Sequence, residues 1–490
     1  MALVRQRLRV RFAQAQPWIY QHPLLFVTIV ATVPRVVFAV VSFVLNGGVL
    51  IHDETQYLTL ANHVATGHTA DSWYPFYGQA LYNSTWAFVA PLVQLVKVFG
   101  PHRIVGQLLA VGFGVAVVVC TSWMVLLARG SKRMAIVAGV VAALLPSQVL
   151  WSSVVLRESE IWLAVVLIGV GLAASATRRG VRALVPLLAC VVGLCMLAHL
   201  RDQTMIAAGW AMGLTLLFLP SPTRLLRAAV GLGIVLWLPV QLGLGWGGWY
   251  LVQRAAPSLG ATRTKLAQEA KSAFTPTSLF ETTTTVVATG GRVTTTTARP
   301  AGGGGGGGVH RTTTTTTTAP PPTIPPGYEI FKYEEHTYLV DETVSGHVQQ
   351  LPRGLVAMTL RPFPWDAATS VDVRLAQIEN FVWFVLYGFA VIGFWVRRRW
   401  TALLAYPFFV SGMVVGIAAV TEGNLGTAFR HRGQILWAVA VAAAVGGDWV
   451  VNRRSGEAAP SAAVGLDPAD ACEPVAVKWL TVVQEPARDR

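Results

Sequence analysis

Charged residues are scarce in this chain of 490 residues. They occupy 13% of the positions, whereas hydrophobic residues occupy 53% and the mean hydropathy is +0.52. Because soluble domains carry roughly 25% charged residues, this scarcity excludes an ordinary soluble protein. Apolar runs of about 20 residues, the length that crosses a bilayer, recur along the chain and indicate an integral membrane protein.

Cysteine is equally scarce, with four residues in the whole sequence. Cys120, Cys190 and Cys195 fall in apolar runs, and Cys472 falls near the C-terminus. No cysteine is expected in an external loop, which argues against a disulfide framework and against thiol catalysis there. A cleavable signal peptide is not expected either, because the first apolar run is long and lacks a small-residue cleavage site.

The formal net charge of +14 describes topology and not a nucleic-acid partner. Basic residues gather in short segments between the apolar runs, as they do in cytoplasmic loops, so no nucleic acid is predicted to bind. The pattern predicts an all-α polytopic membrane protein with about ten transmembrane helices and with both termini in the cytoplasm. The predicted spans are 24–45, 104–127, 134–152, 160–177, 181–199, 204–220, 228–246, 379–396, 401–420 and 433–450.

The spans and loops divide the chain into larger segments. These are a cytoplasmic N-terminal segment at 1–23, an N-terminal transmembrane module at 24–246 with an external loop at 46–103, a long external loop at 247–378, C-terminal transmembrane helices at 379–450 and a cytoplasmic tail at 451–490. A Thr-, Gly- and Pro-rich insert at about 281–327 cannot bury enough apolar surface to order, so disorder is predicted. Residues 328–345 alternate aromatic and charged side chains, which predicts a hairpin or extended strands, and residues 351–365 predict a strap on the membrane surface.

Asp53 and Glu54 follow the first span directly, at the predicted external membrane surface. Acidic side chains near a bilayer are disfavoured and tend to be kept for chemistry, ion handling or a partner. The other predicted external loops carry ionisable groups as well, so we expect these loops to contribute to one site. The groups concerned are Tyr57, Arg157, Glu158, Arg201, Glu422, Arg430 and Arg432.

Structural roles compete with functional ones at these positions. Asp53 and Glu54 suit a helix N-terminus, where the helix dipole stabilises an acid, and Arg157 with Glu158 suits an ion pair at the end of a span. The first-loop histidines do not have the spacing of a zinc site. A divalent cation (Mg or Mn) on Asp53 and Glu54 stays open. Arg35, inside the first span, is expected to face the bundle and to pair there.

The chemistry of these side chains favours group transfer from a lipid phosphate. A carboxylate at a membrane face can act as a general base on an acceptor hydroxyl, and arginine forks fit phosphate oxygens. The order of motifs resembles the polytopic GT-C glycosyltransferases of the protein mannosyltransferase and lipid A aminoarabinose transferase type. The resemblance covers about residues 20–220 and rests on Asp53-Glu54-x-x-Tyr57-x-x-x-Ala61, the stretch Tyr82 to Gly100, Pro101 to Leu109, and Leu145-Pro146-Ser147 to Leu156-Arg157-Glu158.

This resemblance implies an inverting glycosyltransferase, either a hexosyl- or a pentosyltransferase, that uses a polyprenyl-phosphate-linked sugar at the extracytoplasmic face of the plasma membrane. The acceptor would be a cell-envelope glycan, a glycolipid or a protein. In that family a first-loop aspartate is the base, which falls on Asp53 here with Glu54 beside it, and external-loop arginines hold the carrier phosphate. The phosphate-binding candidates are Arg157, Arg201, Arg430 and Arg432, and the residues expected to orient the acceptor or a cation are Glu158, Tyr57 and Glu422.

Two features depart from that family, and two other functions compete. No soluble sugar-binding domain is expected after the last span, and the Thr/Gly-rich insert is foreign to the family. A transporter or flippase of lipid-linked saccharide would carry ionisable residues in mid-span and broken helices. A non-catalytic envelope-assembly protein would keep the fold without the activity. The excess of arginine over lysine, with abundant Ala, Gly and Val, suggests a high-GC bacterium.

Overall fold

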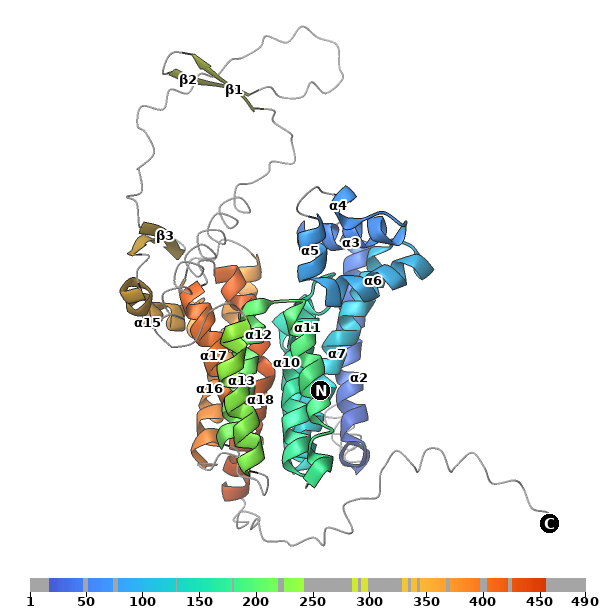
Figure 1. Cartoon of the computed structure of the whole chain (residues 1–490), viewed down its shortest axis with the longest axis vertical. Helices are drawn as coiled ribbons and strands as arrows, with labels where there is room; N and C mark the ends of the chain where they lie inside the picture. Colours follow the sequence, from blue (N-terminus) through green and yellow to red (C-terminus); the bar gives the residue numbers. More distant parts are fainter. Residues whose placement is uncertain are drawn as a thin grey trace, which may run out of the picture.

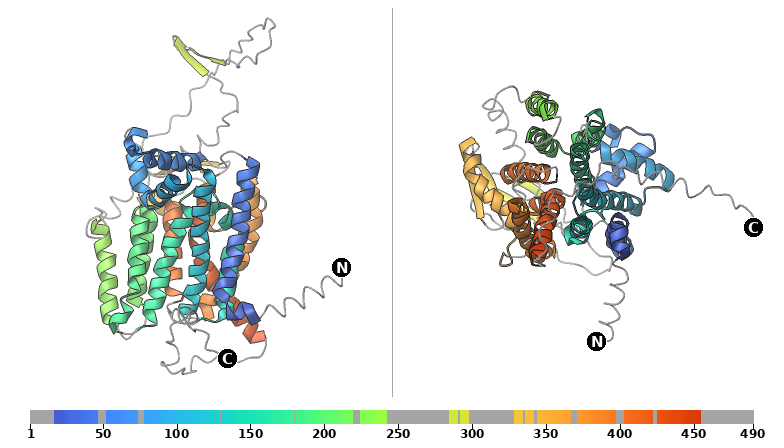
Figure 2. Two further views of the ribbon diagram at one scale, coloured as in Figure 1. Left: turned by 90° about the vertical axis from the view of Figure 1, so that its right-hand side faces the viewer. Right: turned by 90° about the horizontal axis from the view of Figure 1, so that it is seen from below.

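The protein is a bundle of roughly parallel helices with a layer of short helices across one end (Figure 1). In Figure 2 the same layer lies at the top of the left-hand view. We refer to this end of the bundle as the α3–α6 end. The computed structural model describes residues 17–46, 52–73, 78–128, 130–178, 180–218, 224–241, 284–289, 292–297, 328–333, 336–341, 344–366, 371–396, 403–421 and 425–454.

The bundle consists of the apolar helices that the sequence predicts, since each predicted run overlaps one of them. Their bounds are α2 (Pro23–Asn46), α7 (Arg103–Leu127), α8 (Lys132–Leu144), α9 (Pro146–Trp151), α10 (Glu158–Ala176), η1 (Gly180–Ala183), α11 (Leu187–Ala198), α12 (Asp202–Phe218), α13 (Arg224–Gln241), α16 (Val371–Val396), α17 (Ala405–Thr421) and α18 (Leu425–Arg454). Among the described residues, α2, α7, α10, α16 and α18 are long and apolar enough to cross a membrane. The chain is therefore an α-helical membrane protein, and the ten-span topology stays a prediction.

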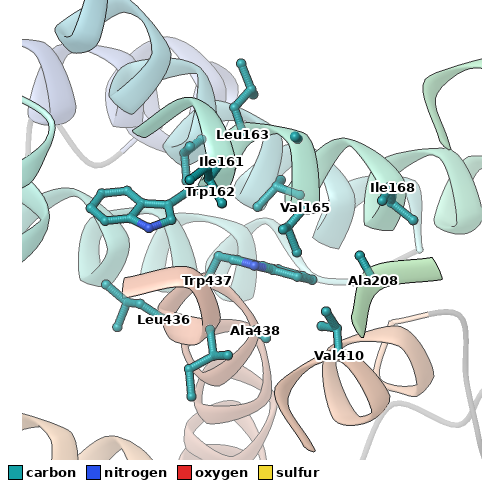
Figure 3. Packing of buried hydrophobic residues seen from close by; sticks show 14 of the residues in the cluster. Ile161, Trp162, Leu163, Val165, Ile168, Ala208, Val410, Leu436, Trp437 and Ala438 are labelled. Carbon is teal, nitrogen blue, oxygen red and sulfur yellow. The ribbon is translucent and has the colours of Figure 1, made fainter. Parts of the chain in front are cut away.

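Helices α10 and α18 pack against each other at the centre of the bundle. Both helices are largely buried, whereas α2 lies at the edge with much of its apolar surface exposed. Trp162 of α10 and Trp437 of α18 fill this junction, and Val410 of α17 lies beside them (Figure 3). Gly433 permits the close approach, because a Cβ there would lie 2.6 Å from the Trp162 ring. This contact fixes the first half of the chain against its last helix.

The layer at the α3–α6 end covers the first bundle helices. It consists of α3 (His52–Ala65), α4 (Ala70–Trp73), α5 (Gly78–Ser84) and α6 (Trp86–Phe99). Apolar side chains of α6 recur at helical spacing on one face, which is buried. Tyr57 of α3 meets Phe88 of that face edge-on, with 5.6 Å between the ring centroids. The contact fixes α3, and with it Asp53 and Glu54, over the end of the bundle.

Among the described residues, the long predicted external loop contains two hairpins, the helix that follows them and the start of α16. Strand β1 (Thr284–Thr289) pairs antiparallel with β2 (Arg292–Thr297), and β3 (Tyr328–Tyr333) pairs with β4 (His336–Asp341). The hairpin predicted from residue 328 onward is confirmed up to Asp341, and α15 (Val344–Leu360) follows it. Strands β1 and β2 lie within the insert for which the sequence predicts disorder, and their β-branched Thr and Val side chains favour strands. The remainder of the 281–327 insert lies outside the described residues.

Arg35, in the middle of α2, is buried and faces the bundle, as predicted. Its Nε donates to Ser152 Oγ at 2.8 Å, and its Nη1 donates to the Ala143 carbonyl at 2.9 Å. The Ala143 carbonyl belongs to the last turn of α8, which ends before Pro146 because proline supplies no N–H to continue the helix. Arg35 thus caps α8 and positions the segment that leads to α10.

An Arg35→Leu substitution tests this capping role. It leaves the Ser152 hydroxyl and the Ala143 carbonyl without their charged donor inside the bundle. Since an unsatisfied buried polar group costs about 1–3 kcal/mol, we expect the free energy of unfolding to fall by roughly 3 kcal/mol. Thermal unfolding in detergent measures the change, with Val37→Leu on the exposed face of the same helix as the control. An equal Tm for the two variants would contradict the capping role.

Candidate active site

The two adjacent acids of α3 lie in different environments. The Glu54 side chain is only 2% exposed and forms a salt bridge with Arg103, whose Nε lies 3.0 Å from Oε2. Arg103 Nη2 donates to the other carboxylate oxygen at 3.3 Å, and the backbone N–H of Val155 donates to Oε2 at 3.2 Å. Glu54 therefore ties α3 to the start of α7 and to the segment before α10. These contacts are structural, and the catalytic role of Glu54 stays a prediction.

Asp53 has the opposite character. Its side chain is 47% exposed, and its Oδ2 lies 3.6 Å from Nη1 of Arg430, beyond hydrogen-bonding distance. Within the described part of the chain, the Asp53 carboxylate accepts no hydrogen bond. It also lies in the first turn of α3, where the helix dipole favours an ionised acid. Of the two acids, Asp53 is the more exposed and the more loosely paired.

Arg430 of α18 approaches Asp53 from the other half of the chain. Its side chain is 26% exposed, and its Cζ lies 4.4 Å from the centroid of the Trp151 ring. The indole holds the guanidinium plane by a cation–π contact that uses none of its N–H groups. Among the described residues, no hydrogen bond from this guanidinium is found. The N–H groups of Arg430 could therefore bind an anion.

Glu158 and two further arginines complete the group. Glu158 begins α10, is buried, and lies 3.7 Å from Nη2 of Arg201. Arg157 and Arg430 also interact electrostatically with the Glu158 carboxylate. Arg157 Nη1 donates to the carbonyls of Leu200 at 2.7 Å and Ser84 at 3.2 Å, which joins the layer to the end of α11. We call Asp53, Arg157, Glu158, Arg201 and Arg430 the charged cluster.

Tyr57 lies one helical turn after Asp53 and is buried beside the charged cluster. Burial is the main cause that raises the pKa of the Tyr57 phenol. Arg157 and Arg201 lower this pKa, whereas the carboxylates of Glu158 and Asp53 raise it. The net effect is an increase, so the phenol stays protonated at neutral pH. Tyr57 can therefore donate a hydrogen bond to a ligand oxygen.

Arg432 does not belong to the charged cluster, contrary to the sequence prediction. It is 1% exposed, and its Nε donates to the Met358 carbonyl at 2.9 Å. Its remaining nitrogens donate to Asn380 Oδ1 and to the Arg361 carbonyl. The physical reason is helical geometry, because residues two apart point to nearly opposite sides of a helix. Arg430 therefore faces α3 while Arg432 faces α15 and α16.

The remaining predictions concern Glu422 and a cation. Glu422 lies outside the described residues. In the described ranges, no group of three or more His, Cys, Asp or Glu side chains is arranged to hold a metal. The two oxygens of Glu54 bind Arg103 and a backbone N–H, so a cation at the predicted pair would rely on Asp53. The cation stays a prediction.

Sequence reasoning missed Arg103 and Trp151. Arg103 was part of a quoted motif, and its position at the start of a predicted span on the external side was a usable signal, since cations are infrequent there. Trp151 carried no signal in the sequence. Its contact with Arg430 depends on the packing of α9 against α18, which joins residues far apart in the chain.

Substitutions of the adjacent residues Glu54 and Asp53 test which of the two acids stabilises the fold. Glu54→Gln removes the charge opposite buried Arg103, and breaking a buried pair costs about 3–5 kcal/mol, so the free energy of unfolding should fall by that amount. Asp53→Asn changes a half-exposed side chain and should alter the same quantity by less than about 0.5 kcal/mol. Thermal unfolding of both variants in one detergent provides the comparison. A larger loss for Asp53→Asn would reverse the assignment.

Comparisons with protein-family models, curated proteins and solved structures give no match for this chain. The likeness to GT-C glycosyltransferases therefore stays a resemblance that rests on the motifs quoted above. The geometry of the charged cluster is then the observation from which a function can be inferred. Its main feature is a long ion pair of 3.6 Å between Asp53 and Arg430, whose atoms form no hydrogen bond with the described residues, at the α3–α6 end of an apolar bundle.

Proposed function

We propose that the protein is a membrane glycosyltransferase that moves a sugar from a polyprenyl-phosphate carrier to an acceptor hydroxyl at the extracytoplasmic face of the plasma membrane. The observation that carries this proposal is the pairing of Asp53 with Arg430. Apart from this ion pair, the Asp53 oxygens accept no hydrogen bond and the Arg430 nitrogens donate none among the described residues. A general base and an anion site are the two parts that such a transfer requires. The acceptor is a cell-envelope glycan, a glycolipid or a protein.

The balance of charge supports an anionic ligand. The charged cluster contains three arginines and two carboxylates, which gives it a formal charge of +1. Both ion pairs within it are long, at 3.6 and 3.7 Å, whereas the structural pair between Glu54 and Arg103 measures 3.0 Å. Loose pairs leave room for a phosphate to replace a carboxylate as the partner of an arginine. Of the three arginines, Arg430 forms the ion pair with Asp53, whereas Arg201 and Arg157 interact with Glu158.

The proposed reaction proceeds in one displacement. Asp53 accepts the proton of the acceptor hydroxyl, and the acceptor oxygen forms a bond to C1 of the sugar. The bond between C1 and the phosphate oxygen breaks, and its electron pair leaves with the carrier phosphate. The phosphodiester monoanion thereby becomes a monoester with a second negative charge, which the excess positive charge of the cluster stabilises. Attack from the face opposite the leaving group inverts C1.

The position of Arg430 also connects donor binding with the base. A carrier phosphate that binds Arg430 takes the place of Asp53 as the partner of the guanidinium, which leaves the Asp53 carboxylate to the acceptor hydroxyl. In this scheme Tyr57 donates to a substrate oxygen, Glu158 fixes Arg201, and Glu54 positions the helix that carries Asp53.

One observation favours a transporter of lipid-linked saccharide as the second candidate. Glu160 lies buried in α10, and its Oε2 has no hydrogen-bond partner among the described residues. An ionisable side chain inside a span often marks a transport path. The other buried ions of the spans have structural partners, since Arg35 caps α8 and Glu379 accepts hydrogen bonds from Ser147 and Trp383. Transfer therefore remains the better-supported function.

Asp53→Asn should abolish transfer without unfolding the protein. Because general base catalysis contributes about 10²–10⁴-fold, we expect the rate to fall by at least 100-fold. The assay uses proteoliposomes and a panel of polyprenyl-phosphate sugars with membrane extract as acceptor. Asp448→Asn, near the other end of α18, is the matched control and should keep its rate. Wild-type turnover by Asp53→Asn would remove the base, and movement of the labelled lipid between leaflets without transfer would favour the transporter.

Arg430→Gln should weaken binding of the carrier phosphate. Loss of a charge-assisted arginine contact costs about 1.5–3 kcal/mol, so we expect a rise of 10-fold or more in the Kd for farnesyl phosphate as a short carrier probe. Arg453→Gln, on the exposed far end of α18, should leave the Kd unchanged. Binding is measured in detergent and needs no acceptor. An unchanged Kd for Arg430→Gln would exclude this arginine from the phosphate site whatever the outcome at Asp53.

A further inference from the structure

The turn that follows α15 has an unusual set of backbone partners. Side chains of α16 and α18 bind six of the carbonyl groups of residues 358–366, which span the last residues of α15 and the turn. Arg432 binds the carbonyls of Met358 and Arg361, Asn380 binds those of Leu360 and Pro362, and Gln377 binds those of Phe363 and Asp366. Carbonyls of loops at a protein surface are ordinarily left to water. Here three side chains are committed to six carbonyls of one short segment.

The side chains of the turn are also arranged differently from those of a water-exposed loop, because its charged groups pair with each other and an aromatic ring is exposed. Its two charged side chains pair with each other, with Arg361 Nε 3.0 Å from Asp366 Oδ2, and the Asp366 side chain is 10% exposed. Asp366 also accepts the backbone N–H of Phe363 at 2.7 Å. The outward side chain is Trp365, which is 78% exposed. Its ring stacks on Phe363 at 4.9 Å with an interplanar angle of 7°.

The side chains that donate to these carbonyls show where the turn lies along the apolar stretch of α16. Gln377 and Asn380 lie one to two helical turns inside the apolar stretch Arg374–Val396 of α16, which is long enough to cross a membrane. The carbonyls that they bind must lie at the same level. Ile378 and Phe381, on the first turns of the same stretch, are exposed apolar side chains of the kind that face lipid. The turn is therefore level with residues of the span and not above them.

We infer that residues 361–366 are seated in the interfacial layer of the bilayer, with Trp365 inserted among lipid headgroups and upper acyl chains. Where water is excluded, backbone polar groups need partners within the protein, which accounts for the four carbonyls of residues 361–366 that side chains bind. Trp prefers the membrane–water interface, because its ring is apolar and its N–H can still reach a polar partner. A sugar-binding aromatic platform, by contrast, faces water and does not require satisfied carbonyls behind it. The inference does not depend on the proposed glycosyltransferase activity.

Fluorescence quenching in liposomes tests this placement. The four cysteines are replaced by alanine, Trp365→Cys is labelled with bimane, and the full chain is reconstituted in phosphatidylcholine and phosphatidylglycerol. Ser72→Cys, exposed in the α3–α6 layer, serves as the aqueous reference, and Phe381→Cys serves as the lipid reference. We expect iodide to quench position 365 at least threefold less than position 72. Lipid carrying a doxyl group near its headgroup should quench position 365 about as strongly as position 381.

Equal iodide quenching at positions 365 and 72 would overturn the inference and would show that Trp365 faces water. Since Trp365→Cys also removes the anchor itself, Pro364→Cys provides a second reporter that keeps the tryptophan. Pro364 is exposed beside Trp365 and must give the same ordering of the two quenchers. Strong iodide quenching at position 364 would overturn the inference as well.

Discussion

The buried ion pair of Glu54 with Arg103 is the interaction on which the charged cluster depends. It joins the start of α3, the start of α7 and the backbone of Val155, three points that are far apart in the sequence. Asp53 precedes Glu54 directly, and Glu158 follows Val155 by three residues. The same pair therefore fixes the positions of both cluster carboxylates. A buried ion pair adds little net stability, but it demands one geometry, and a defined geometry is what this end of the bundle requires.

Arginines have three roles in this protein, and their surroundings decide between them. Arg35 and Arg432 are fully buried, and their donors satisfy backbone carbonyls that would otherwise be unpaired in an apolar region. Arg103 neutralises a buried acid. Arg430 is partly exposed, stacks on an indole and donates no hydrogen bond within the described residues. Residue type alone does not distinguish these roles, whereas the partners within the described residues do.

Much of the architecture was predictable because hydrophobicity and local chemistry determine it. Apolar runs of membrane length became helices, Arg35 faced the bundle, and alternation from residue 328 onward became a hairpin. The meeting of Asp53, Glu158, Arg201 and Arg430 also followed from topology, since alternate loops lie at one end. The separate environments of Asp53 and Glu54 were not predictable. They depend on which acid meets Arg103, a contact over 49 positions that no local pattern encodes.

Two polar regions of opposite design lie near the boundary of the apolar bundle. In the turn after α15, the two charged side chains pair with each other and side chains of α16 and α18 bind four backbone carbonyls, as expected where lipid replaces water. In the charged cluster, Asp53 and Arg430 are partly exposed and only loosely paired, which would be costly in contact with lipid alone. A ligand that reaches both environments has an apolar tail and an anionic head. This contrast supports a lipid phosphate as the proposed donor. A water-soluble sugar phosphate would not need a binding site near the boundary of the apolar bundle.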